Sequence, residues 1–172
     1  MITNKKHILI SYPIVAVLFA LDQVTKYLFT NVYKTLIPNV LSLYYSENTG
    51  AAWSILTGKV FFLAIMSALF LIVLIIFSHK FKEKTVYYSI TYAFIIAGAL
   101  GNLYDRIFFG FVRDFIQADF ISFMSFPIFN LADSLLVIGV IMFAIFVLII
   151  YPINLRGKKT KWKTNFWLMK II

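Results

Sequence analysis

The sequence lacks several of the residues and patterns on which enzyme active sites are commonly built. It has no cysteine, which excludes disulfides, thiolate chemistry and cysteine-based metal sites. Its two histidines, His7 and His79, belong to no His-Glu-x-x-His pattern, and no glycine-rich phosphate loop is present. We therefore expect neither a metal nor another cofactor.

Charge is also scarce. Charged residues make up 13% of the 172 residues and hydrophobic residues 62%, whereas soluble domains have about 25% charged and about 45–50% apolar residues. Four apolar stretches approach or exceed the roughly 20 residues that a membrane-spanning helix needs. They lie at about 8–27, 60–78, 86–107 and 131–151. The composition predicts an all-α polytopic membrane protein with four transmembrane helices.

The distribution of Lys and Arg predicts the orientation. Eleven of the sixteen lie before the first stretch, between the second and third, or after the fourth. The positive-inside rule makes these segments cytoplasmic, so both termini are expected inside and loops 28–59 and 108–130 outside. The basic charge is explained by topology and requires no nucleic-acid partner, since a phosphate-binding groove would need a soluble face.

The two outer loops differ from the short cytoplasmic connection. Val40–Tyr45 and Phe111–Ile116 alternate partly between apolar and polar residues, which predicts short strands on the outer membrane surface. Asn48-Thr-Gly50 is expected to form a turn between two such strands. No repeat or linker is visible, so we expect residues 1–172 to form a single domain.

The basic, aromatic tail at 153–172 permits two interpretations. It can lie on an anionic membrane surface, or it can be a solvated segment that follows the last helix.

Two aspartates lie within the apolar stretches, and each follows an asparagine by three residues: Asn102 with Asp105, and Asn130 with Asp133. A carboxylate in hydrocarbon costs roughly 3 kcal/mol or more, so it marks a candidate functional site. The spacing of three places amide and carboxylate on one helix face. The predicted topology puts both acids at the outer ends of their helices, where a pair can share a proton and activate water. For Asp133, helix capping is the competing interpretation.

Two other features of the helices are expected to be structural. Asp22 and Lys26 form an i, i+4 pair that we expect to neutralise itself at the interface and to help orient substrate, with Lys26 pointing outward. Gly98 and Gly101 offer small residues for close helix packing.

Charged residues near the third helix and its following loop are less specific. Arg106 and Arg113 can counter the acids or bind a lipid phosphate. Asp114 and Asp119 are expected outside the membrane and are less informative.

Five segments, in order over more than a hundred residues, carry a family resemblance. They are Asp22–Lys26, Asn48–Trp53, Gly98–Arg106, Val112–Ile116 and Phe129–Ser134. On these segments the chain resembles the lipoprotein signal peptidases (signal peptidase II), the aspartyl proteases of bacterial inner membranes. The resemblance implies four helices with a small extracytoplasmic β-cradle.

The resemblance also implies roles for individual residues. Asp105 and Asp133 would be the catalytic dyad, without a metal. The residues that would shape or orient the site are Asp22, Lys26, Asn48, Gly50, Asn102, Arg106 and Asn130.

The implied substrate is a prolipoprotein with a diacylglyceryl-modified cysteine, cleaved on the N-terminal side of that cysteine. The site would lie at the outer face of the cytoplasmic membrane. We expect a monomer that contacts membrane phospholipid and binds no nucleic acid.

Two rival functions fit the sequence less well. Presenilin-type and prepilin-peptidase-type proteases share the Tyr104-Asp105 dipeptide, but the Gly-x-Gly-Asp element is missing and the helices are too few. A proton or cation transporter would place polar groups across the whole bilayer depth. Here they gather at one end of the helices, which favours the protease.

Overall fold

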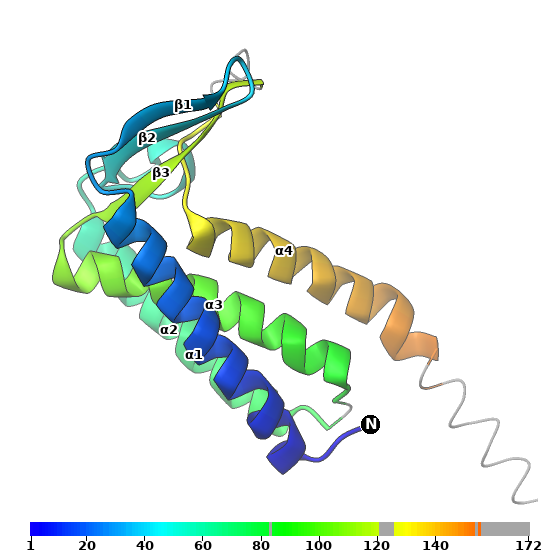
Figure 1. The fold of residues 1–172 in the computed structure, drawn as a ribbon. Helices are drawn as coiled ribbons and strands as arrows, with labels where there is room; N and C mark the ends of the chain where they lie inside the picture. Colours follow the sequence, from blue (N-terminus) through cyan, green and yellow to red (C-terminus); the bar gives the residue numbers. More distant parts are fainter. Residues whose placement is uncertain (83, 121–125, 154, 156–172) are drawn as a thin grey trace, which may run out of the picture.

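The computed structural model describes residues 1–82, 84–120, 126–153 and 155. This part of the chain contains four long helices with a small antiparallel sheet at one end (Figure 1). The helices are α1 (Asn4–Leu28), α2 (Val60–Lys80), α3 (Val86–Phe108) and α4 (Leu131–Ile145), and α4 continues through a π-helical turn, η3 (Phe146–Ile150). Apart from residues 153 and 155, the predicted basic tail lies outside the described residues.

All four predicted membrane-spanning helices are confirmed, with boundaries that follow the local capping residues. The Thr3 side chain accepts a hydrogen bond of 3.2 Å from the Lys6 amide, so α1 begins earlier than the apolar stretch itself. Thr85 caps α3 in the same way, accepting from the Tyr88 amide at 3.0 Å. Each helix, with α4 followed to Ile153, is long and apolar enough to cross a bilayer.

Helix α3 lies at the centre and packs against α1, α2 and α4 (Figure 1). Its side chains are buried along most of its length, whereas the other three helices expose large apolar side chains. Phe61 on α2 is 80% exposed and Leu148 beyond α4 is 75% exposed. Apolar surface of this extent fits hydrocarbon rather than water.

Small residues on α3 allow its neighbours to approach closely, as predicted. A Cβ atom at Gly98 would lie 2.8 Å from Leu136 Cγ of α4. A Cβ at Gly101 would collide with the Asp22 carboxylate of α1 and lie 3.1 Å from Ala132 Cβ of α4. Glycine at position 101 therefore lets three helices meet at one point near the sheet.

The sheet has the order β1 (Tyr33–Ile37), β2 (Leu41–Asn48), β3 (Val112–Ala118) and is antiparallel throughout. The predicted strands in both loops are thus confirmed. The prediction that Asn48–Gly50 joins two strands was wrong. That segment leads from β2 into the short helix η1 (Ala52–Ser54) and then into α2. The end of β2 pairs with β3, which comes from the other outer loop, and so no strand follows the turn.

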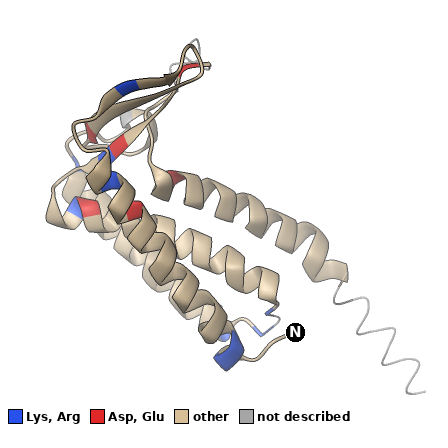
Figure 2. Ribbon diagram, viewed as in Figure 1, with Lys and Arg blue, Asp and Glu red and all other residues tan. Residues whose placement is uncertain are grey.

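The opposite end of the bundle holds a buried histidine. The two ring nitrogens of His7 each lie 2.8 Å from a serine hydroxyl, Ser89 on α3 and Ser78 on α2. This arrangement ties α1, α2 and α3 together at the end away from the sheet. The described acids, in contrast, cluster at the sheet end (Figure 2).

Candidate active site

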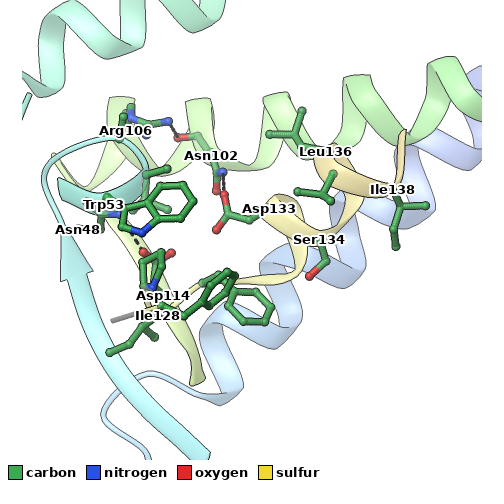
Figure 3. Close-up of a pocket in the computed structure, with 17 residues that line it drawn as sticks. Asn48, Trp53, Asn102, Arg106, Asp114, Ile128, Asp133, Ser134, Leu136 and Ile138 are labelled. Atoms are coloured by element: carbon green, nitrogen blue, oxygen red, sulfur yellow. Dashed lines mark hydrogen bonds between the residues drawn. The ribbon is translucent and has the colours of Figure 1, made fainter. Parts of the chain in front are cut away.

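A pocket of about 480 Å³ lies where the sheet meets α3 and α4. Two carboxyls, Asp114 of β3 and Asp133 of α4, line it, and Figure 3 shows both turned toward the same space. Apolar walls surround them on the other sides. The larger of these apolar residues are Trp53, Phe126, Ile128, Phe129, Leu136 and Ile138.

Asn130 holds both carboxyls at the start of α4. Its side-chain oxygen accepts from the Asp133 amide at 3.0 Å, and its own amide donates to Asp133 Oδ2 at 3.1 Å, which forms a capping box. Its Nδ2 donates to Asp114 Oδ1 at 2.6 Å. The capping role anticipated for this pair is therefore present, and the same asparagine also fixes the second acid.

The backbone explains why Asn130 lies next to β3. The Phe129 carbonyl accepts from the Phe115 amide at 3.0 Å and the Ile116 amide at 2.8 Å, and the Phe129 amide donates to Ile116 at 3.0 Å. The segment before α4 is thus bonded to β3. Helix α4 consequently begins beside Asp114.

Asn102 connects the pocket to the buried charges behind it. Its Nδ2 donates to Asp133 Oδ1 at 2.7 Å, while its Oδ1 accepts from Lys26 Nζ at 3.1 Å and from Asn130 Nδ2 at 3.2 Å. The i, i+3 spacing suggested a partnership between Asn102 and Asp105 on α3. The side-chain hydrogen bonds of Asn102 described above instead reach Lys26 of α1 and the start of α4.

The turn after β2 supports the other side of Asp114. Asn48 Nδ2 donates to Asp114 Oδ2 at 3.0 Å, and the Gly50 amide donates to Asn48 Oδ1 at 2.8 Å. Arg106 Nη2 in turn donates to the Gly50 carbonyl at 3.2 Å. Asn48 and Arg106, which both line the pocket, are therefore connected through Gly50.

Asp114 has an unusual protonation equilibrium. Burial raises its pKa, and the nearby negative charge of Asp133 raises it further, to about 7, although hydrogen bonds from Asn48 and Asn130 act in the opposite direction. A carboxyl with this pKa carries a proton in a large fraction of molecules near neutral pH.

Asp105 is fully buried but does not line the pocket. Arg113 binds it through its backbone amide at 2.9 Å, Nε at 3.1 Å and Nη2 at 2.8 Å. Lys26 Nζ lies 3.4 Å from its Oδ2. Both oxygens of Asp105 are thus engaged in ion pairs, away from the space between Asp114 and Asp133.

Asp22 and Lys26 form the predicted ion pair, at 3.0 Å. The expectation that Lys26 points outward was wrong, because its side chain is completely buried between Asp22, Asn102 and Asp105. Asp22 Oδ1 also accepts from the Ala132 amide at 2.9 Å, which anchors the first turn of α4. Both residues position the elements of the site.

Asp114 is the pocket residue whose importance the sequence did not reveal. Neighbouring residues on a strand face opposite sides, so Arg113 points back to Asp105 while Asp114 points into the pocket. A charged pair within the apolar segment Phe111–Ile116 was the available signal. Asp119, which was expected outside the membrane together with Asp114, does not line the pocket. It accepts a 2.5 Å hydrogen bond from the Ser42 hydroxyl of β2.

The charges of this region leave room for one proton. Four carboxyls face three cations, so one excess negative charge remains when all are ionised. A single proton shared by the pocket acids would make the cluster neutral. The seven groups are Asp22, Asp105, Asp114, Asp133, Lys26, Arg106 and Arg113.

Comparisons with known sequences agree with the family predicted from the five segments. A family model described as "Signal peptidase (SPase) II" matches residues 14–149. The lipoprotein signal peptidase of Enterococcus faecalis (strain ATCC 700802 / V583) is 42% identical over 156 residues, which cover 88% of this chain and 95% of that protein. The lipoprotein signal peptidase of Staphylococcus aureus (strain JH9) is 39% identical over 151 residues, covering 84% and 92%.

Solved structures agree as well. Two structures, both described as a bacterial membrane enzyme, are 38% identical to this chain, with TM-scores of 0.74 and 0.72. The first match covers 80% of this chain and 87% of the solved chain, and the second covers 81% and 92%. The fold is therefore that of a multi-pass bacterial membrane enzyme. The chain belongs to the signal peptidase II family, and the predicted resemblance is confirmed.

Proposed function

We propose that this protein is an aspartyl endopeptidase that removes signal peptides from prolipoproteins. The observation that carries the proposal is the pair Asp114 and Asp133, held in one pocket by Asn130. Family membership supports the substrate, since the relatives from Enterococcus faecalis and Staphylococcus aureus are named lipoprotein signal peptidases.

This proposal revises the dyad expected from the sequence, in which Asp105 partnered Asp133. Asp105 is engaged by Arg113 and Lys26 and does not line the pocket. We assign Asp105 a positioning role, because its bonds to Arg113 fix the strand that carries Asp114. The second catalytic carboxyl is then Asp114.

The surroundings assign different tasks to the two acids. Asp133 lies in the first turn of α4 and accepts hydrogen bonds from the Asn130 amide and the Asn102 side chain, all of which favour a carboxylate. Asp114, with its raised pKa, holds the proton. Asp133 is therefore the general base and Asp114 the general acid in the resting pair.

The reaction follows from these protonation states. Asp133 takes a proton from a water molecule as the water oxygen attacks the scissile carbonyl carbon, and Asp114 donates its proton to the carbonyl oxygen. The resulting diol then collapses as the carbon–nitrogen bond breaks. The proton on Asp133 passes to the leaving amine, and one diol hydroxyl returns a proton to Asp114, which restores the starting protonation states. This sequence forms no covalent enzyme intermediate.

The position of the pocket suits a lipid-anchored peptide. Its apolar walls are formed partly by α4, a membrane-spanning helix, and partly by residues around the sheet. A diacylglyceryl group in the bilayer would hold the adjacent peptide bond at this level and so raise its effective concentration. We propose cleavage on the N-terminal side of the lipidated cysteine.

We also propose the orientation in the membrane. Lys80, Lys82 and Lys84 lie at the α2–α3 connection, at the end of the bundle opposite the sheet, which the positive-inside rule makes cytoplasmic. Both termini then face the cytoplasm and the pocket faces outward. The protein would act as a monomer in contact with phospholipid.

Cleavage by purified protein tests the proposal. A precursor with a diacylglyceryl cysteine should give a product whose first residue is that cysteine, identified by mass spectrometry, and activity should survive EDTA. The same precursor without lipid should be cleaved far more slowly. Absence of cleavage of the lipidated precursor, or loss of activity on chelation with recovery by one divalent metal, would contradict the proposal.

A further inference from the structure

A second hollow, of about 510 Å³, lies between α2 and α3. Its walls are apolar except for Arg106, and Arg106 also lines the pocket of the two acids. We call this hollow the α2–α3 groove. Val60, Ala64 and Ala68 of α2 line it on one side, and Leu103, Arg106 and Ile107 of α3 line it on the other.

The groove is elongated along α2. Val60, Ala64 and Ala68 succeed one another at intervals of four and so lie on one helix face. Eight residues of helix correspond to a length of about 12 Å. The groove therefore runs from the sheet end of the bundle into the membrane-spanning part of α2, parallel to the direction in which a lipid chain lies.

Arg106 places a hydrogen-bond donor at the sheet end of the groove. A guanidinium has five N–H groups, and the described contacts are with backbone carbonyls, Gly50 at 3.2 Å and Asn102 at 3.5 Å. Among the described residues no carboxylate lies within ion-pair distance of Arg106. N–H groups of Arg106 are therefore available to oxygen atoms of a ligand.

We propose that one acyl chain of the substrate's diacylglyceryl group lies in the α2–α3 groove, with Arg106 donating hydrogen bonds to the glycerol ester oxygens. The inference rests on the proposed function and names the lipid subsite of the same reaction. Arg106 lines both the α2–α3 groove and the pocket of the two acids. This favours the substrate lipid, rather than a resident phospholipid, as the occupant of the groove. In the substrate the lipid is attached to the residue next to the scissile bond, so one molecule can fill both hollows.

Filling the groove tests this assignment. Ala64→Phe places an aromatic ring in the groove, and Ala144→Phe makes the same change at an exposed position of α4 that lines neither hollow. Both are assayed with precursors whose diacylglyceryl group carries two long or two short chains. For Ala64→Phe, the ratio of kcat/KM for the long-chain precursor to that for the short-chain precursor should fall about tenfold, equivalent to about 1.4 kcal/mol.

The ratio should keep its wild-type value in Ala144→Phe. An unchanged ratio in Ala64→Phe would overturn the groove assignment while leaving the proposed function intact, whereas failure of wild-type protein to cleave either precursor would overturn the function itself. If Ala64→Phe does not fold, Ala64→Leu is measured in its place.

A binding measurement identifies the occupant directly. Because the chain has no cysteine, Ala64→Cys can carry a single fluorophore, placed in an Asp133→Asn background so that precursor is not consumed. Precursor with a nitroxide on its acyl chain should quench this fluorophore more strongly than nitroxide-labelled phospholipid at the same mole fraction, and Ala144→Cys should show no such preference. Equal quenching by both lipids would assign the groove to phospholipid and overturn the proposal.

Discussion

The Arg113 guanidinium donates two hydrogen bonds to the Asp105 carboxylate, from Nε to Oδ2 at 3.1 Å and from Nη2 to Oδ1 at 2.8 Å. The Arg113 backbone amide donates a third, to Oδ2 at 2.9 Å. The pair joins the end of α3 to the start of β3. Since Asp114 is the next residue on that strand, the pair determines where the Asp114 carboxyl points. Asp105 thus acts on the pocket through the backbone.

Asp105→Asn should therefore reduce the stability of the fold strongly and the activity of each folded molecule only partly. Removing one partner of a buried ion pair costs roughly 3–5 kcal/mol, since Arg113 loses its ion-pair partner while Lys26 keeps the pair with Asp22. Thermal unfolding in detergent should show a clear decrease in Tm, while the folded fraction keeps measurable activity. Asp119→Asn, at the residue that follows β3, should change Tm much less. Unchanged Tm with complete loss of activity would make Asp105 catalytic, as the sequence first indicated.

Asn130 should be needed for activity beyond its capping role. Loss of a cap costs about 1 kcal/mol, so Thr85→Ala should lower stability by about that amount. Asn130→Ala should lower it further, because it also breaks buried hydrogen bonds to Asn102 and Asp114. Only Asn130→Ala also removes the 2.6 Å hydrogen bond to Asp114. Its kcat should fall by at least about tenfold, and Thr85→Ala should remain near wild type. Equal activities of the two variants, measured per folded molecule, would refute this role.

The sequence was sufficient to predict the membrane architecture. The lengths of the four apolar stretches determine the spanning helices, and the alternation in the two loops predicts strands that the structure contains as β2 and β3. Helix ends shifted by a few residues because single capping residues, such as Thr3, set them. Asn48–Gly50 was misplaced because strand pairing between distant loops is a tertiary property.

The proposed replacement of Asp105 by Asp114 in the dyad depends on contacts that the sequence could not predict. Asp105 was favoured because it lies in an apolar stretch at the same end as Asp133. Which acid reaches Asp133 depends on how β3 pairs with Phe129 and on the burial of Arg113 against α3. Neither contact has a local sequence signature.

The pH dependence should report the proton on Asp114. This carboxyl must be protonated to act as the acid, and its pKa is raised to about 7, so activity should fall as the pH rises through that value. Asn48→Leu removes a donor that favours the ionised form, which raises the pKa further. The alkaline limb of kcat/KM should therefore move to higher pH in Asn48→Leu and stay in place in Gln117→Leu, a change on the opposite face of β3. A shift to lower pH would contradict the assignment.

The orientation can be tested with single cysteines, since the native chain supplies no background. Thr35 on β1 and Lys82 in the α2–α3 connection are both exposed. In intact cells Thr35→Cys should react with a membrane-impermeant thiol reagent, and Lys82→Cys should react only after the cells are opened. The reverse pattern would place the pocket at the cytoplasmic face.

The central claim, that Asp114 and Asp133 act as one catalytic pair, is tested most directly by single-turnover cleavage of the lipidated precursor. The assay uses equal amounts of folded wild type, Asp105→Asn, Asp114→Asn, Asp133→Asn and the double variant of the pocket acids. Asp114→Asn and Asp133→Asn should each lose nearly all activity, the double variant should be scarcely worse because the two residues act as a unit, and Asp105→Asn should retain measurable turnover. Substantial cleavage by Asp114→Asn, together with none by Asp105→Asn, would contradict the account and return Asp105 to the dyad.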